Sequence, residues 1–282
     1  MDDRPAGPAA YVTRDRGVRM ADTGPWALIL GASSGFGEAT SLELARAGYD
    51  IIGVHLDRRS TLPHVEQVIH GIRTAGRRAL FFNVNAADPE RREEVLFRAT
   101  EEMGPTGAVA VLLHSLAFGN LRPFVADNPQ DAITAAQMDM TLTVMANSLV
   151  YWAQDLVHRG MLRTGGKIFA MTSAGGTRVL PNYGAVSAAK AALESHIRQL
   201  AMELAPRGIA VNAIRAGVTD TPALRKIPGH EVIAETALRR NPSGRLTTPE
   251  DVAHAIAALC RPGTEWITGN VIGVDGGEDV IG

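Results

Sequence analysis

Short apolar runs alternate with longer stretches of helical periodicity along most of the chain, and this alternation restricts the fold more than any other feature. Several runs lack the apolar and polar alternation of a half-exposed strand, which is typical of strands covered by helices on both faces. The predicted strands are 27–30, 50–56, 79–84, 108–114, 167–172, 210–214 and 270–274. The predicted helices are 38–47, 62–75, 89–103, about 131–159, 183–205 and 249–260. One continuous series of this kind predicts an α/β fold with a doubly wound parallel sheet of about seven strands.

Two segments do not follow this pattern. Residues 1–25 mix Pro, Gly, Ala and charged residues without periodicity, so we expect a flexible N-terminal arm before a single domain over 26–282. Residues 215–245 contain three prolines and lack a clean period, which predicts a long irregular connection. Such a connection after a strand is often a lid over bound substrate.

Composition and charge exclude several classes of protein. The 28 basic residues against 30 acidic ones give a formal net charge of -2, without the excess of positive charge that nucleic-acid binding requires. The single cysteine, Cys260, excludes an intrachain disulfide and a cysteine-based metal site, as in a reducing compartment. No run approaches the roughly 18 apolar residues of a membrane span. We therefore expect a cytoplasmic protein with no nucleic-acid, membrane or metal partner.

A glycine-rich turn follows the first predicted strand and precedes a helical run. Its glycines let the backbone turn sharply and approach a pyrophosphate, while the helix offers unpaired N–H groups and its positive dipole end. The spacing, G-x3-G-x-G, differs from the common G-x-G-x-x-G. The turn predicts a dinucleotide site whose contact residues are Gly31, Ser33, Ser34, Gly35, Phe36 and Gly37.

The end of the second predicted strand bears on which dinucleotide binds. A carboxylate about 20 residues beyond the turn binds the adenosine ribose hydroxyls of NAD, whereas an arginine there pairs with the 2'-phosphate of NADP. This segment offers both, because His55, Asp57, Arg58 and Arg59 fall within five residues. We favour NADPH, because the two arginines reach the same volume as Asp57, and we keep NADH as the alternative.

Tyr183 and Lys190 lie seven residues apart on a predicted helix. Seven steps of about 100° bring a side chain back to within roughly 20° of its starting direction, so the two share a face. The position four residues after the tyrosine is Ser187, so the lysine lies nearly two turns along, a rise of about 10 Å. The two side chains can therefore serve one site.

Together with the turn, Asn83-Val84, Ser173 and the closing segment 267–277, this pair makes the chain resemble the short-chain dehydrogenase/reductase family, from about Trp26 to Gly277. Most members have Tyr-x3-Lys, whereas this chain has Tyr-x6-Lys. It also has His-Ser-Leu-Ala-Phe at 114–118, where ordinary members have an Asn-Asn-Ala-Gly-like run. Both departures are similar to the divergent branch of enoyl-acyl-carrier-protein reductases of fatty-acid synthesis, which implies a Rossmann-like fold.

Some positions depart from that branch. Ser173 stands where the first type of such enoyl reductase carries a second tyrosine, and a serine there is similar to a smaller type that prefers NADPH. The asparagine that ordinary family members keep in the helix after the fourth strand is missing from its expected place, where we find Met145, although Asn147 lies close. This departure argues against the usual proton-relay chain.

The resemblance implies a role for each site residue. Reducing an enoyl thioester builds negative charge on the thioester oxygen, which requires a hydrogen-bond donor. Tyr183 is implied to be that donor, Ser173 a second one, and Lys190 the residue that holds the nicotinamide ribose. Reducing a carbonyl instead needs a tyrosine whose pKa is lowered by a nearby cation.

The resemblance also assigns the remaining contacts. It implies that Asn83 and Val84 lie near the adenine, Ser115, Leu116 and Ala117 along the cofactor, and Gly217, Thr219 and Thr221 at the nicotinamide amide and the phosphates. His114 is expected to pack beside the cofactor as a strand-end histidine.

The predicted function is NAD(P)H-dependent reduction of a trans-2-enoyl thioester, with acyl carrier protein as a partner that Arg225, Lys226, Arg239 and Arg240 would dock. One alternative is a family member that acts on a ketone or alcohol, such as a 3-oxoacyl thioester. Another is a dinucleotide-sensing regulator without turnover, against which the intact set of Tyr183, Lys190 and Ser173 argues. Because family members are commonly dimers or tetramers, we expect a homo-oligomer.

Overall fold

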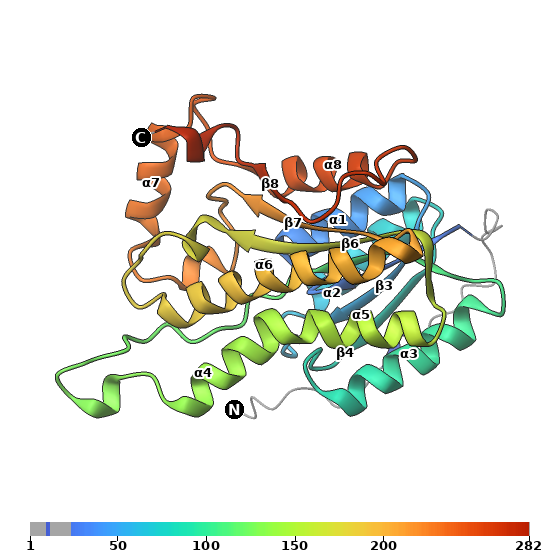
Figure 1. The fold of residues 1–282 in the computed structure, drawn as a ribbon, viewed down its shortest axis with the longest axis horizontal. Helices are drawn as coiled ribbons and strands as arrows, with labels where there is room; N and C mark the ends of the chain where they lie inside the picture. The colour runs from blue at the N-terminus through green and yellow to red at the C-terminus, as the bar shows by residue number, and fades with distance from the viewer. Residues whose placement is uncertain (1–9, 12–23, 282) are drawn as a thin grey trace.

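A single sheet forms the centre of the computed structural model, which describes residues 10–11 and 24–281 (Figure 1). The strands lie in the order β1 (Ala10–Tyr11), β4 (Ala79–Asn83), β3 (Asp50–His55), β2 (Trp26–Leu30), β5 (Val109–His114), β6 (Leu162–Ser173), β7 (Ala210–Ala216) and β8 (Val271–Val274). The seven strands from β2 to β8 pair in parallel. The order runs outward in both directions from the β2/β5 pair, so the predicted doubly wound fold is confirmed.

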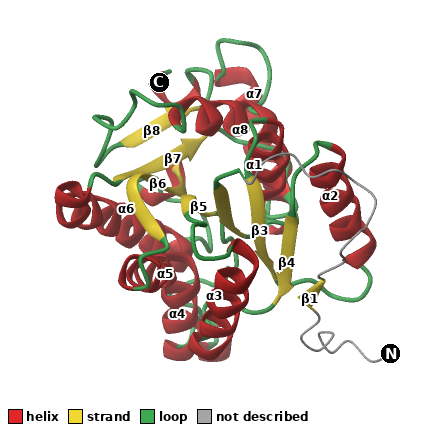
Figure 2. Ribbon diagram, turned by 90° about the vertical axis from the view of Figure 1, so that its right-hand side faces the viewer, coloured by secondary structure: helices red, strands yellow, loops and turns green. Residues whose placement is uncertain are grey.

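Helices cover both faces of the sheet (Figure 2). One face carries α1 (Gly35–Arg46), α2 (Leu62–Thr74) and α8 (Pro249–Leu259). The other carries α3 (Pro89–Met103), α4 (Ala135–Leu142), α5 (Ser148–His158) and α6 (Gly184–Leu204). None of the helices within the described residues is long and apolar enough to span a membrane.

The central strand β2 shows why its sequence is uniformly apolar. Ala27 and Ile29 face the core beneath α1, α2 and α8, whereas Leu28 and Leu30 face the core beneath α3, α5 and α6. All five residues of the strand are buried. Burial on both faces removes the period-two pattern that a half-exposed strand would show.

The connection predicted to be irregular contains a helix, α7 (His230–Arg240). The prediction for 215–245 is therefore wrong over these eleven residues. Only Ala237 of the helix is buried, so the sequence shows no apolar stripe, and prolines stand close to both ends. The helix begins after Gly229, which has a φ of 76°, and ends at Asn241 before Pro242.

The N-terminal arm also contains a short strand. Ala10 and Tyr11 pair antiparallel with Phe82 and Phe81 of β4, so the expectation of an arm without regular structure is wrong for these two residues. The other residues of the predicted arm up to 23 lie outside the described residues.

The strand β6 begins five residues earlier than predicted. Residues 163–165 are exposed, so the start of this strand lacks the apolar run on which the prediction depends.

The helix predicted at about 131–159 consists of three segments. Its start is fixed by Thr134, which forms a capping box with Gln137 ahead of α4. A π-helical turn, η2 (Thr143–Asn147), then joins α4 to α5. Such turns are rare inside helices and are frequent at functional sites.

Candidate active site

The glycine-rich turn after β2 makes the closest backbone approaches in the site. Gly31 has a φ of 89°, and a Cβ atom there would lie 2.4 Å from the carbonyl oxygen of Ser115. A Cβ atom on Gly37 would lie 2.0 Å from the carbonyl oxygen of Gly31. Ser34 is the N-cap of α1 but makes no side-chain capping bond, so the helix start is not closed by its own cap. This glycine-rich turn at a helix N-terminus fits a pyrophosphate.

A cavity of about 470 Å³ opens beside this turn, at the carboxyl ends of the strands where ligands bind in open α/β sheets. It brings together twelve of the predicted residues from five separate segments: Ser34, Gly35, Phe36, Ser115, Leu116, Ala117, Ser173, Tyr183, Lys190, Gly217, Thr219 and Thr221. Thr221 packs against the turn, since a Cβ atom on Gly35 would lie 3.4 Å from its methyl carbon. The connection after β7 therefore closes the cavity over the turn.

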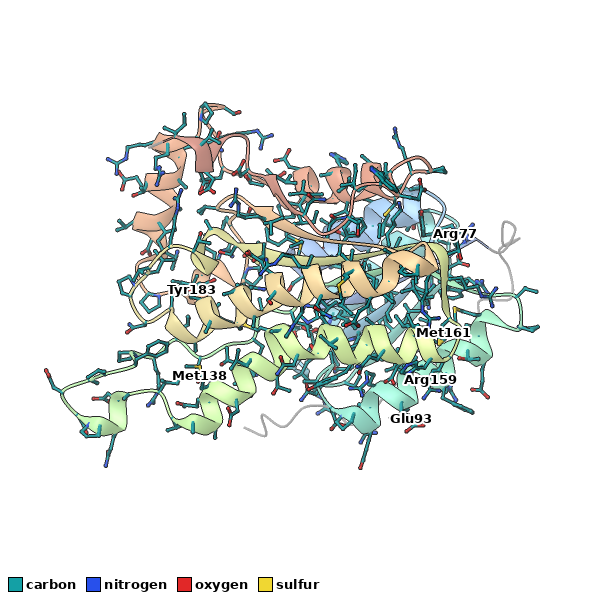
Figure 3. The ribbon with its side chains drawn as sticks, viewed as in Figure 1. Arg77, Glu93, Met138, Arg159, Met161 and Tyr183 are labelled. Carbon is teal, nitrogen blue, oxygen red and sulfur yellow. The ribbon has the colours of Figure 1, made fainter. Side chains whose placement is uncertain are left out.

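Tyr183 lies at the start of α6, at the end of the helix nearest α7 (Figure 3). Its phenol lies close to the side chain of Ser173, the last residue of β6. Burial raises the pKa of Tyr183 above its ordinary value, and the interaction with Ser173 only partly opposes this. Gly175 leaves room for the ring, because a Cβ atom there would lie 2.5 Å from the ring carbon Cε1. The structure therefore presents a neutral phenol.

Lys190 is fixed to the neighbouring strand. Its Nζ donates to the carbonyl oxygen of Met171 at 2.7 Å, and the residue is only 5% exposed. Burial lowers the pKa of Lys190 to about 8, although the charge of Glu194 opposes the shift. Glu194 in turn accepts a bond of 2.7 Å from Thr172 of β6. The lysine thus lines the cavity in a set position, with a pKa of about 8.

His114 lies behind the cavity and does not line it. The residue is fully buried, with Nε2 2.9 Å from the hydroxyl of Ser148, which donates to the carbonyl of Val144. Burial, together with the charge of Lys190, lowers the pKa of His114 to about 3. The imidazole stays neutral in a packing position, as expected for a strand-end histidine.

The π-helical turn η2 contains both residues that stand near the position of the family's usual asparagine, and only one of them lines the cavity. Met145 lines the cavity. Asn147 instead pairs its Oδ1 with Nε2 of His196 at 3.0 Å, on the side of α6 away from the cavity. The amide of Asn147 is therefore not available to the site.

The other eight predicted cofactor residues lie outside this cavity, toward the ends of β2, β3 and β4: Gly31, Ser33, Gly37, His55, Asp57, Arg58, Asn83 and Val84. Asp57 is the centre of this group. Burial opposes its ionisation, but bonds from His55, Ser33 and Thr61 lower the pKa of Asp57 to about 2. His55 Nδ1 lies 2.9 Å from one carboxylate oxygen and the Thr61 hydroxyl 2.7 Å from the other. The turn and the end of β3 thus share one ionised carboxylate.

Asn83 and Val84 support this carboxylate from β4. The side chain of Asn83 accepts from the N–H of Asp57 at 2.9 Å and donates to its carbonyl at 3.0 Å. Val84 is buried, and its N–H donates to the carbonyl of His55 at 2.8 Å. Both residues fix the main chain around Asp57.

Two charged residues that line the cavity, Arg178 and Glu278, were not predicted, and two more, Lys226 and Arg240, were predicted only as docking residues. Glu278 comes from the C-terminal turn η6 (Glu278–Val280), which follows Gly276 and Gly277, both with positive φ. The signal in the sequence is the Asp-Gly-Gly at 275–277, because two glycines in the left-handed region reverse the chain. Glu278 lies far along the chain from the other site residues, so no local pattern in the sequence links it to them.

Residues 31–278 match the family model described as enoyl-(acyl carrier protein) reductase. The chain belongs to the short-chain dehydrogenase/reductase family. It is 34% identical over 257 residues to a 3-oxoacyl-acyl-carrier-protein reductase of Aggregatibacter actinomycetemcomitans, covering 89% of this chain and 97% of that protein. It is 30% identical over 265 residues to a 1-cyclohexenylcarbonyl-CoA reductase of Streptomyces collinus, covering 93% and 90%.

The fold is similar to the crystal structure of an enoyl-acyl-carrier-protein reductase (NADH) of Aquifex aeolicus, with a TM-score of 0.79. That match covers 92% of this chain and 98% of the other at 24% identity, so it bears on the fold alone. Family membership together with the dinucleotide-binding turn makes this short-chain dehydrogenase/reductase an NAD(P)-dependent oxidoreductase.

Proposed function

We propose that the protein reduces the 2,3 double bond of a trans-2-enoyl thioester, with a bound reduced nicotinamide supplying the hydride. The observation that carries the proposal is the state of Tyr183. Its pKa is raised by burial, and Lys190 is bonded to Met171 rather than contributing to a lowered pKa of the phenol. A neutral phenol suits a reaction that needs a hydrogen-bond donor and no proton release.

In this proposal the chain stabilises charge at one oxygen of the substrate. When hydride adds to the β-carbon, Tyr183 donates a hydrogen bond to the thioester oxygen that carries the developing negative charge, and water supplies the proton that the α-carbon then takes up. The neighbouring Ser173 interacts with the phenol and helps to orient it. Lys190 of α6 binds the nicotinamide ribose from the position in which its bond to Met171 of β6 fixes it. A donor of this kind contributes about 3 kcal/mol to lowering the barrier.

The cavity walls also suit an acyl chain. Leu180, Ile227 and Ile233 contribute apolar side chains from the loop before α6 and from the lid, residues 215–245. α7 contributes to the wall, which supports the interpretation of this connection as a lid. An apolar wall next to a polar end is the arrangement expected of a pocket for a lipid-like substrate.

The second candidate is reduction of a 3-oxoacyl thioester, which the 3-oxoacyl reductase at 34% identity favours. That reaction needs a proton on the substrate oxygen, hence a tyrosine acid with a lowered pKa. The raised pKa of Tyr183 argues against it. The 1-cyclohexenylcarbonyl-CoA reductase, whose name describes a conjugated thioester substrate, supports the enoyl reading.

The test compares crotonyl and acetoacetyl thioesters with purified protein and reduced cofactor. The loss of absorbance of the reduced cofactor measures turnover, because one cofactor molecule is oxidised for each substrate molecule reduced. We expect oxidation of cofactor with the crotonyl thioester and none with the acetoacetyl thioester. The opposite preference would establish the second candidate.

For the cofactor, the placement of Asp57 leads us to propose NADH in place of the NADPH that the sequence favours. The carboxylate is ionised and bonded to Ser33 of the turn, where the adenosine ribose binds in this fold. A carboxylate accepts hydrogen bonds from ribose hydroxyls and repels a 2'-phosphate. Arg58 lies exposed beside it and is the residue that an NADPH enzyme would use.

A further inference from the structure

Asn182, the residue directly before Tyr183, has an unusual main-chain conformation. Its φ is 60°, and among residues 10–11 and 24–281 it is the one non-glycine residue with a positive φ. This left-handed region is uncommon for residues with a Cβ atom, although asparagine adopts it more readily than most. Such conformations persist only where the surrounding structure enforces them, and they cluster at active sites.

The conformation belongs to a tight turn that leads directly into α6. The N–H of Tyr183 donates to the carbonyl oxygen of Leu180 at 3.2 Å, which closes a turn of four residues. Pro181 at the second position and a residue of positive φ at the third are the combination typical of a type II turn. The N–H of Ser187 then donates to the carbonyl of Tyr183 at 2.8 Å, as the helix begins. The tyrosine is thus both the last residue of the turn and the N-cap of the helix.

The turn joins two residues of the cavity wall. Leu180 and Tyr183 both line the cavity, whereas Pro181 and Asn182 between them do not. A hydrogen bond therefore links an apolar residue of the wall to the residue that carries the phenol. The main-chain conformation of Asn182 determines the direction of one relative to the other, although its side chain is not part of the wall.

The packing around Tyr183 leaves little room for its ring to adjust. The residue is 8% exposed. A Cβ atom on Gly175 would lie 2.5 Å from the ring carbon Cε1, and one on Gly184 would lie 2.5 Å from Cζ of Phe124. The phenol oxygen is at the far end of this side chain, so a change of main-chain direction at Asn182 is carried to that oxygen.

We propose that Asn182 is a positioning residue, whose left-handed conformation aims the phenol of Tyr183 at the reacting oxygen of the substrate. The inference rests on the donor role of Tyr183 in the proposed function, but not on the choice between an enoyl and a 3-oxoacyl thioester. A β-branched residue with this φ would be strongly disfavoured, so the turn relaxes to a negative φ. The donor then lies away from the oxygen on which charge develops.

The test compares three substitutions at this one position, assayed with whichever of the crotonyl and acetoacetyl thioesters the wild type reduces. Asn182→Gly keeps access to a positive φ without the amide, so we expect kcat to remain within about twofold of the wild type. We expect kcat to fall by about threefold for Asn182→Ala and by about tenfold or more for Asn182→Val, with KM little changed.

Affinity for the reduced cofactor, measured by titration calorimetry, shows whether each variant is folded. It should be unchanged in all three variants, because the turn lies apart from the predicted cofactor contacts. If the Val variant does not bind cofactor, the comparison of Asn182→Ala with Asn182→Gly decides the inference.

A double-mutant cycle separates aiming of the phenol from a general effect on the cavity. In the background of Tyr183→Phe, which has no hydroxyl to aim, Asn182→Val should cause no further loss of kcat. Losses that add in the double variant would assign Asn182 to the shape of the cavity and overturn the inference.

Two other results at Asn182 would also overturn it. Wild-type turnover in the folded Ala and Val variants would show that the conformation does not direct the phenol. Equal losses in the Gly and Val variants would assign the effect to the amide side chain. Wild-type turnover in Tyr183→Phe alone would remove the donor role and this inference with it, so a failure of the proposed function is recognised without any variant of Asn182.

Discussion

The Nζ of Lys190 donates to the carbonyl oxygen of Met171 at 2.7 Å, two residues before Ser173 at the end of β6. The strand that ends in the partner of Tyr183 therefore also fixes the ammonium. Seven positions apart, the tyrosine at the helix start and the lysine two turns along have separate anchors. This separation is the physical reason to assign them separate roles, one at the substrate oxygen and one at the ribose.

Tyr183→Phe tests the donor at the substrate oxygen. We expect turnover of the crotonyl thioester to fall by about a hundredfold or more, with little change in KM, because the lost bond strengthens only as charge develops. Steady-state kinetics with saturating cofactor measure the effect. Tyr151→Phe, at an exposed position on α5, is the matched control, and comparable losses in both variants would remove Tyr183 from the mechanism.

The pKa of Lys190 predicts a limit on activity at alkaline pH. Burial lowers the pKa of this ammonium from 10.5 to about 8, so the charged form is present below that pH and is lost as the pH rises through it. We expect cofactor affinity and turnover to decline together above about pH 8. Lys190→Arg keeps a cation that does not titrate in this range, so a folded variant should lose the decline. An identical alkaline limb in the variant would assign it to another group.

Asp57→Asn tests the choice of cofactor. Removing the charge eliminates repulsion of a 2'-phosphate and weakens the bonds to the ribose hydroxyls, so the ratio of kcat/KM for NADH over NADPH should fall by about tenfold or more. Asp127→Asn, at an exposed site in the loop after β5, should leave the ratio unchanged. A wild type that already prefers NADPH would contradict the assignment to NADH and point to Arg58.

Carrier-protein docking is expected to depend on two cations of the lid. Arg225 is bonded to Asp220 at 2.7 Å and Arg240 donates to the carbonyl of Ile281, which leaves Lys226 and Arg239 as the exposed candidates. Reversing both to Glu should raise KM for a crotonyl-carrier protein by about tenfold, and less so for an uncharged crotonyl N-acetylcysteamine thioester. Equal effects on the two substrates would exclude a docking role.

The sequence predicts the sheet and the centre of the site well, because both depend on local patterns. β2 lies within one residue of its prediction, since five buried residues form an apolar run. α3 has the predicted bounds, with Pro89 at its first position and Asp88 capping it through bonds to two N–H groups. Three residues of the turn, Ser34, Gly35 and Phe36, line one cavity together with Tyr183 and Lys190, whereas Gly31, Ser33 and Gly37 lie outside it.

What the sequence misses depends on contacts between distant segments. α7 buries only Ala237 and so lacks the apolar period of a packed helix. The pairing of Asn83 with the main chain of Asp57 joins residues 26 positions apart, and the bond from the N–H of Val218 to the carboxylate of Glu278 joins residues 60 apart. No periodicity records such pairs, because each depends on how the strands align in the sheet.

The wide turn at Thr143–Asn147 has a consequence for how the helix before it can change. A π turn closes with one residue more than an α turn, so deleting one residue there would restore an α turn and leave α4 and α5 nearly in their present relative direction. Met145 lies within this turn and lines the cavity, so such a deletion would act on the cavity wall. The turn can therefore gain or lose one residue at the substrate side while the core beneath α5 keeps its packing.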